Sequence, residues 1–216
     1  TRSGRKPAAI SSTQQAAGGA SQQATEAKQS AESKKPGSKN PKSKKARAPF
    51  KWVNPPPESS VPGLKHATFL SPSLGNDVGY LILFPAGYER TEQRYPVVHY
   101  LHGGRPGNES KNYRLAEPIQ KLMKSSGLAP SIYVFVNGGP VSHYNMPDDD
   151  RSQGASVFIK ELIPHIASTY RTIADRSGRG LEGFSQGGRG TMRLALRYPN
   201  LFCSAAAGGG GYESEK

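Results

Sequence analysis

The sequence predicts an α/β fold in which a mostly parallel sheet carries helices on both faces. Short apolar and β-branched runs, the expected strands, alternate along the chain with stretches of helical period. Clusters of Gly, Pro, Asn and Ser separate them and mark turns. Strands that alternate with helices form parallel sheets, and 216 residues are enough for one such domain and a tail.

The N-terminal segment, residues 1–48, is predicted to be a disordered basic tail of low complexity. Ile10 is its one large aliphatic residue, so the segment cannot bury enough apolar surface to offset the entropy of ordering. Residues 1–51 hold 12 Lys/Arg and 2 Asp/Glu, a net charge of +10, and the remainder carries +3. The basicity therefore belongs to the tail, which argues against a specific nucleic-acid-binding domain. The tail is either a solvated linker or a segment that binds an anionic polymer.

The elements of the domain follow from local pattern. Residues 49–65 are expected to form a stiff, Pro-rich connector, and the domain itself is expected to occupy residues 66–216. Pro164 lacks a backbone N–H, so it should kink a helix or begin a new one. The expected elements are a hairpin (66–71 and 78–84), a strand (96–101), a helix (112–126), a strand (131–136), a helix (152–170), a strand (179–184), a helix (186–198) and a last strand (201–207).

A G-x-S-x-G motif at residues 183–187 marks Ser185 as a candidate nucleophile. The motif joins a predicted strand to a predicted helix, which is the setting that a nucleophile elbow requires. Gly183 and Gly187 would let the chain turn sharply without collision, and the helix start would place free N–H groups beside the hydroxyl. The alternative interpretation is a serine in a Gly-rich turn, such as a phosphate-binding loop.

A second Gly-rich segment, His102-Gly103-Gly104, follows the first buried strand. A serine nucleophile on such an elbow that attacks a carbonyl group needs two backbone N–H groups that stabilise the resulting oxyanion. We expect Gln186, which follows the nucleophile, to supply one of them and Gly104 to supply the other. His102 is a poor candidate for the general base, because it precedes the nucleophile and its glycines indicate a backbone role. A plain Gly-rich loop is the alternative here.

Residues 66–212 resemble the esterase D-like (putative esterase) family of α/β-hydrolases, which includes feruloyl esterases, S-formylglutathione hydrolases, enterochelin esterase-like proteins and mycolyltransferases. The resemblance implies an α/β-hydrolase fold and acyl-enzyme chemistry, with Ser185 as nucleophile and the N–H groups of Gly104 and Gln186 as oxyanion donors. It rests on the order of GYLILFPAGY (79–88), YPVVHYLHGG (95–104), ELIPHI (161–166), YRT (170–172), EGFSQGG (182–188) and YPNLF (198–202).

The sequence departs from the family pattern after the nucleophile. The triad order in this fold is Ser, then Asp or Glu, then His, yet all five histidines precede Ser185 and the chain ends at Lys216. We therefore expect a fragment that is incomplete at its C-terminus and lacks the triad acid and histidine. The expected function is carboxylic ester hydrolysis. The alternative is a catalytically inactive binding module that its basic tail tethers to an anionic polymer.

The remaining expectations concern ligands and location. His143 and Tyr144 follow the second buried strand, so they should face the same sheet edge as Ser185, where they either contact substrate or form a surface loop. The substrate is expected to be a small-molecule or polymer-linked ester, and the chemistry needs no cofactor or metal. No 18-residue apolar run encodes a transmembrane segment. The tail favours an exported protein, with a cytoplasmic one as the alternative.

Overall fold

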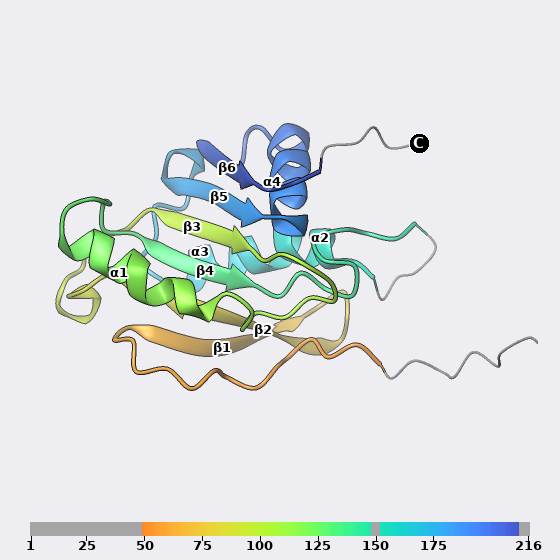
Figure 1. The fold of residues 1–216 in the computed structure, drawn as a ribbon, viewed down its shortest axis with the longest axis horizontal. Coiled ribbons are helices and arrows are strands. Elements are labelled where there is room, and N and C mark those ends of the chain that lie inside the picture. Colours follow the sequence, from red (N-terminus) through yellow and green to blue (C-terminus); the bar gives the residue numbers. More distant parts are fainter. Residues whose placement is uncertain (1–48, 148–151, 212–216) are drawn as a thin grey trace, which may run out of the picture. The chain divides into compact units, whose positions relative to one another are not determined.

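A six-stranded mixed sheet forms the centre of the domain (Figure 1). The computed structural model describes residues 49–147 and 152–211. The strand order is β1-β2-β4-β3-β5-β6; β1 and β2 are antiparallel to each other, β2 is antiparallel to β4, and the remaining pairs are parallel. The predicted hairpin and the predicted parallel strands are thus confirmed. The strands are β1 (Leu64–Ser71), β2 (Asn76–Leu83), β3 (Val97–Leu101), β4 (Ile132–Val136), β5 (Arg179–Phe184) and β6 (Ser204–Gly208).

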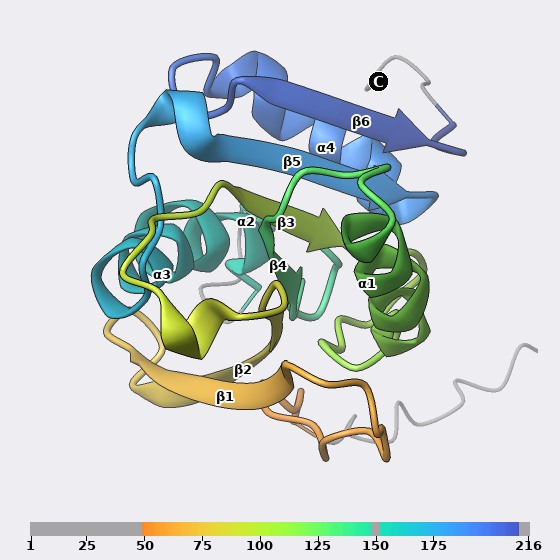
Figure 2. The same cartoon turned by 90° about the vertical axis from the view of Figure 1, so that its left-hand side faces the viewer.

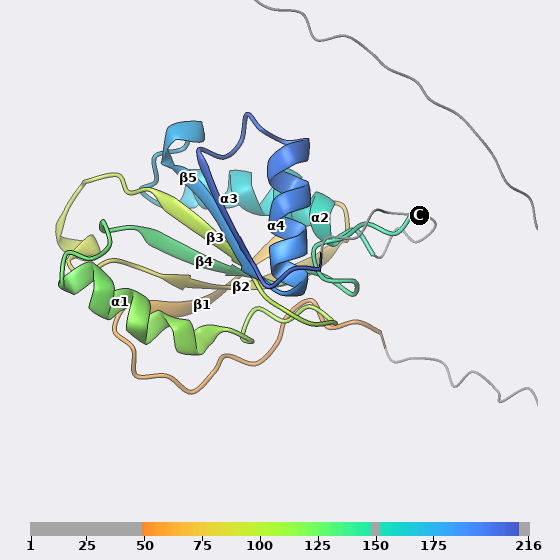
Figure 3. The ribbon, with the colours of Figure 1, turned by 45° about the horizontal axis from the view of Figure 1, so that its top comes forward.

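Helices cover both faces of this sheet. Helix α1 (Ala116–Lys124) packs on one face, where Ala116 and Met123 join a cluster with Leu81 and Phe135. The larger cluster lies on the other face, where α3 (Ile163–Thr169) and α4 (Gln186–Arg197) contribute apolar side chains. Figure 2 shows α1 and α3 on opposite sides of the strands, and Figure 3 shows α4 beside β5 and β6. The strictly buried pattern of β4, from Ile132 to Val136, follows from this covering on both sides.

The helical region expected over residues 152–170 is more broken than its period predicts. It consists of α2 (Gly154–Val157), a π-helical segment (Phe158–Leu162) and α3, which begins at Ile163. Pro164 stands in the first turn of α3, directly after the π-helical segment. The kink or new helix start that we expected at Pro164 takes the form of a π-helical segment directly before α3, and Leu162 and Ile163 keep right-handed helical dihedral angles. The helix expected over 112–126 is shorter than predicted, because Tyr113–Leu115 form a 3-10 turn before α1.

Strand register brings the loops of the candidate site together. Leu101 at the end of β3 pairs with Val136 of β4 and with Gly183 of β5. The carboxyl ends of these parallel strands therefore lie at one edge of the sheet. The loops that follow them, which carry His102, His143 and Ser185, converge there.

The segment expected to be a connector packs onto the sheet. Trp52 is only 9% exposed, and its carbonyl accepts hydrogen bonds from Gly79 N (2.8 Å) and from Asn137 Nδ2 (2.9 Å). The chain joins β1 at Leu64, two residues earlier than expected. The predicted tail, residues 1–48, lies outside the described residues. Within the part of the chain that is described, no helix combines the length and apolar character needed to cross a bilayer.

Candidate active site

Ser185 stands at the junction of β5 and α4 with an unusual backbone conformation. Its φ is +56° and its ψ is −117°, although non-glycine residues rarely adopt positive φ. Two backbone hydrogen bonds hold it there: Ser185 N donates to Gly208 O (2.7 Å), and Arg189 N donates to Ser185 O (3.0 Å). A residue kept in such a conformation by its surroundings is typical of a functional turn.

The glycines beside Ser185 allow β3 and α4 to approach each other directly. A methyl group on Gly187 would overlap the carbonyl oxygen of Leu101, and one on Gly183 would overlap the carbonyl oxygen of Gly187. Gly103 also lies close to the serine, because a Cβ there would be 3.2 Å from Ser185 Cβ and 3.8 Å from Ser185 Oγ. The elbow and the loop after β3 therefore form one packed unit.

Buried contacts fix the protonation of His102. Its Nε2 lies 3.3 Å from Asn108 N and 3.4 Å from Gly138 N, and both of these groups can only donate. The proton must then sit on Nδ1, which donates to Gly103 O (3.0 Å). Burial lowers the pKa of His102 to about 4. Both ring nitrogens are occupied in holding the loop, which agrees with the expectation that His102 is not the base.

His143 supports the loop that carries His102 and Gly103 through a buried hydrogen bond. It is completely buried, has a φ of +63°, and donates from Nε2 to His102 O (3.0 Å). The two imidazole rings lie 4.6 Å apart, and burial lowers the pKa of His143 well below its usual range. Arg193 of α4 donates to His143 O and lies over the ring of Tyr144, 4.1 Å from its centre. Tyr144 is half-buried, whereas His143 has no exposed surface.

Of the two expected oxyanion donors, Gln186 directly follows Ser185, and Gly104 follows Gly103, which packs against the serine. Gln186 is the first residue of α4, where N–H groups have no partner within the helix. Gly104 has a φ of +71° and lies at the surface, and its carbonyl accepts a hydrogen bond from Ser142 Oγ (2.7 Å). Neither backbone N–H donates to an acceptor among the described residues. Both groups are thus available to a ligand.

No histidine of the described residues hydrogen-bonds to the Ser185 hydroxyl. All five are described, and their ring contacts lie elsewhere. His66 pairs with Glu109 (3.1 Å), His165 contacts the Tyr80 hydroxyl (3.0 Å), and His99 packs against Phe158.

A buried carboxylate beside the site has no signal in the sequence pattern. Glu109 is 1% exposed and accepts from Asn54 N (2.7 Å), Asn54 Nδ2 (2.9 Å) and Asn137 Nδ2 (2.9 Å), besides its contact with His66. Lys111 was equally unexpected. Its ammonium group donates to Pro106 O (2.6 Å) and to Gly103 O (3.4 Å). Both residues lie in an irregular loop whose pattern predicts neither contact.

Curated relatives of this chain are esterases. The chain is 29% identical over 152 residues to an esterase of Mycobacterium tuberculosis strain H37Rv, a match that covers 69% of this chain and 32% of that protein. It is 27% identical over 152 residues to an endo-1,4-beta-xylanase/feruloyl esterase of Xylanibacter ruminicola, with 64% and 20% covered. This chain thus spans a third or less of the length of these relatives.

Solved structures and a family model extend the comparison. A ferulic acid esterase superposes with a TM-score of 0.58 at 27% identity, covering 65% of this chain and 57% of that one. An S-formylglutathione hydrolase of Staphylococcus aureus gives 0.55 at 18% identity, with 69% and 58% covered, and supports the fold alone. The family model described as "Putative esterase" matches residues 71–211, which include the elbow and the loop after β3. The chain therefore belongs to the putative esterase family and has the α/β-hydrolase fold.

Proposed function

We propose that this protein is a carboxylic ester hydrolase that uses Ser185 as a nucleophile. The observation that carries the proposal is the strained serine at the start of α4, which packs against Gly103 and directly precedes Gln186, the first residue of the helix. Membership of an esterase family supports hydrolase chemistry. The geometry at Ser185 supports this residue, rather than another, as its centre.

The proposed reaction proceeds in two balanced halves. Ser185 Oγ attacks the ester carbonyl carbon while a base takes its proton, and the N–H groups of Gly104 and Gln186 donate to the oxyanion that forms. The C–O bond to the alcohol then breaks, the alcohol leaves with the proton, and the acyl group stays on Ser185. Water attacks the acyl-enzyme in the same way and releases the acid.

The general base is proposed to come from outside these 216 residues. Ser185 is a weak nucleophile without one, and each of the five histidines has other contacts or packs in the core. In this proposal a later Asp or Glu and a later His complete the triad. His102 and His143 are positioning residues that fix the carbonyls on either side of the Gly103 loop.

The substrate is proposed to be a small-molecule or polymer-linked ester. Of the two residues expected to contact substrate after β4, Tyr144 retains exposed surface and His143 is buried, so Tyr144 is the proposed substrate contact and His143 a positioning residue. Export of the protein is proposed only on the composition of its basic tail. Binding of that tail to an anionic polymer is likewise a proposal.

A serine-directed probe tests the proposed nucleophile. In the full-length protein, a fluorophosphonate should label Ser185, and Ser185→Ala should abolish labelling, whereas Ser177→Ala, which changes an exposed serine just before β5, should leave it unchanged. In the full-length protein, Ser185→Ala should lower kcat for a p-nitrophenyl ester at least about a thousandfold. A purified Ser185→Ala protein that keeps its activity would exclude the mechanism. A well-folded protein that neither labels nor hydrolyses would favour the inactive binding module.

A further inference from the structure

A pocket of about 890 Å³ opens beside the loop that carries the proposed oxyanion donor. Three segments that are distant in sequence form its walls: residues 49–54, residues 105–111 and residues 140–141. The last two segments follow β3 and β4, so the pocket lies at the sheet edge that also carries Ser185.

The charged groups that line this pocket are all cations. They are Lys51, Arg105 and Lys111, and none of the eleven lining residues is Asp or Glu. Among the described residues, no carboxylate forms an ion pair with any of these three cations. The nearby Glu109 is buried, and its oxygens are occupied by Asn54, Asn137 and His66. The pocket therefore presents three cations that have no ion-pair partner among the described residues.

The wall that carries Lys51 is held in place. Asn54 donates both its backbone N–H and its side-chain amide to Glu109, and the carbonyl of Trp52 accepts from Asn137. Lys51 therefore extends from a segment anchored on two sides. A cation on an anchored segment loses less conformational freedom on binding than one on a free tail.

Lys111 joins the wall of the pocket to the loop that carries Gly103. Its Nζ lies 3.4 Å from Gly103 O and donates to Pro106 O at 2.6 Å. Two of its three N–H groups are thus used, and the third has no acceptor among the described residues. Gly103 in turn packs against Ser185, so Gly103 alone lies between Lys111 of the pocket wall and the proposed nucleophile.

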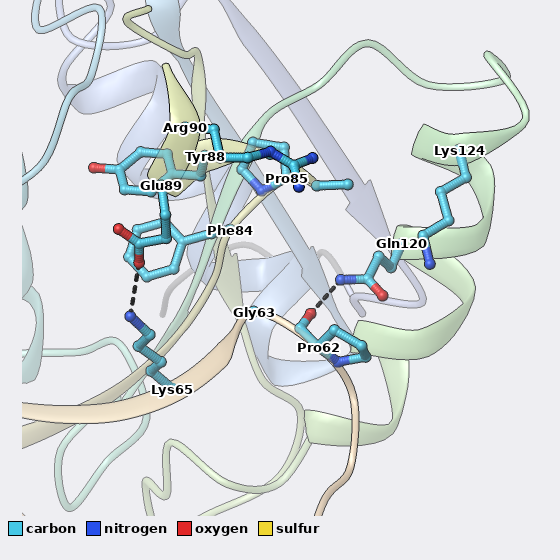
Figure 4. A pocket seen from close by; sticks show the side chains of 12 residues that line it. Pro62, Gly63, Lys65, Phe84, Pro85, Tyr88, Glu89, Arg90, Gln120 and Lys124 are labelled. Atoms are coloured by element: carbon cyan, nitrogen blue, oxygen red, sulfur yellow. Dashed lines mark hydrogen bonds and ion pairs between the residues drawn. The ribbon is translucent and has the colours of Figure 1, made fainter. Parts of the chain in front are cut away.

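A second hollow at the opposite edge of the sheet provides a contrast. It has a volume of about 410 Å³ and follows β2 at Phe84 and Pro85 (Figure 4). Lys65, Arg90 and Lys124 line it, but Glu89 also lies there and pairs with Lys65 at 2.9 Å. Leu83 pairs with Tyr133, near the start of β4, so this hollow is remote from Ser185. Its cations serve as matched controls.

We propose that the pocket formed by residues 49–54, 105–111 and 140–141 binds an anionic group, a carboxylate or a phosphate, carried by the ester substrate. The inference rests on the proposed function, because it assigns a substrate class to the same site. Arg105 and Lys51 make charge-assisted hydrogen bonds to the anion, and Lys111 adds its third N–H. The ester carbonyl of such a substrate would then reach Ser185 from the side of Gly103.

Binding can be measured without turnover, because Trp52, the one tryptophan of the chain, lies between the lining residues Lys51 and Asn54. The 216-residue chain is titrated with 3-phenylpropanoate, with phenyl phosphate and with the neutral 3-phenylpropanamide while Trp52 emission is recorded. We expect saturable binding of at least one anion, at least about tenfold tighter than that of the amide. Arg105→Gln and Lys51→Gln should each weaken anion binding about tenfold, and Arg105→Lys should weaken it less.

The controls separate specific binding from net charge. Arg90→Gln and Lys124→Gln remove the same charge at the remote hollow and should leave anion binding unchanged, and thermal unfolding verifies that every variant folds. Preference for the carboxylate or for the phosphate identifies which group the substrate carries. Equal binding of the amide, or equal losses in the control variants, would overturn the inference.

The proposed function stands or falls on a different measurement. Ser185→Ala should bind the anion as the wild type does, while fluorophosphonate labelling of Ser185 in the full-length protein, which supplies the proposed base, tests the nucleophile. Labelling without anion preference rejects only the pocket. Anion binding together with a well-folded full-length protein that is never labelled rejects the nucleophile and leaves a cationic binding site.

Discussion

Single glycines decide whether the elbow can form. Gly187→Ala would place a methyl group on the carbonyl oxygen of Leu101, which belongs to strand backbone and cannot rotate away. We expect this substitution to lower the free energy of unfolding by about 3 kcal/mol and to abolish labelling of Ser185. Urea denaturation measures the first effect. Gly127→Ala is the control, because the nearest atoms to its methyl group, in Leu122 and Ser125, would lie at ordinary contact distances of 3.4 Å or more. A similar loss in both variants would contradict the packing argument.

His143 offers a test of positioning at the same scale. His143→Phe keeps a ring of similar size but removes the N–H that donates to His102 O. We expect fluorophosphonate labelling to slow about tenfold, because the loop with Gly103 and Gly104 loses its support. His143→Gln, which restores a donor at a similar reach, should recover part of the rate. If labelling falls only in proportion to the fraction unfolded, His143 is structural alone.

At the scale of elements, the buried carboxylate Glu109 connects the segment around Asn54 to the loops after β3 and β4. Glu109→Ala removes the one carboxylate that Asn54, Asn137 and His66 share as a hydrogen-bond partner. We expect a loss of about 3 kcal/mol or more in the free energy of unfolding, measured by urea denaturation. Glu117→Ala breaks an exposed pair with Lys121 and should leave the midpoint nearly unchanged. Equal effects of the two variants would rule out a structural role for the buried carboxylate.

The hydrophobic period and the turn residues of the sequence predicted the strands and the turn at Ser185. The strands around Val134 and Leu181 and the turn at Ser185 could be found because apolar runs, Gly-rich turns and helix starts are encoded within a few residues. Glu109 could not be found, since its partners at positions 54, 66 and 137 are 28 to 55 residues away. Whether a polar residue in a loop is solvated or buried depends on which segments the completed sheet brings beside it.

The dependence on distant contacts and on details finer than the helical period also explains two segments that differ from the prediction, the helical region around Pro164 and the segment around Trp52. The apolar spacing between Val157 and Ile166 fits one helix equally well with or without a π-helical segment. The period alone could therefore not predict the π-helical segment before Pro164. Trp52 is a single apolar anchor in a Pro-rich stretch, and its burial depends on contacts with Gly79 and Asn137.

For the whole molecule, buried histidines predict a marked sensitivity to acid. Burial lowers the pKa of His99 to about 3 and that of His102 to about 4, and it lowers the pKa of His143 as well. In the unfolded chain these groups titrate near 6.5, so below that pH the unfolded state binds more protons than the folded one and stability falls. Between pH 6.5 and 5, His99 and His102 should each remove about 2 kcal/mol.

Thermal unfolding from pH 7.5 to 5 measures this loss. His99→Leu should reduce the dependence on pH and raise stability at pH 7.5, because neither ring nitrogen of His99 has a hydrogen-bond partner in the described core. A variant with the acid sensitivity of the wild type would show that other groups are responsible.

Residues 1–48 contain no residue of the proposed active site. In the full-length protein, their deletion should therefore leave kcat for a small soluble ester unchanged. Binding to an anionic polymer, measured by sedimentation with the polymer, should disappear with the tail and weaken in high salt. A large fall in kcat would instead place part of the tail in the site.

The division of the pocket wall among three loop segments bears on how specificity can change in evolution or by design. Arg105, Lys51 and Val141 lie on loops beyond the ends of the strands, while Gly183 and Gly187 have no room for any side chain. Mutational libraries should therefore yield functional variants at the three wall positions and almost none at the two glycines. Substitutions in one wall loop at a time can therefore change which acid or alcohol part of the ester is accepted, while the elbow that holds Ser185 stays unchanged.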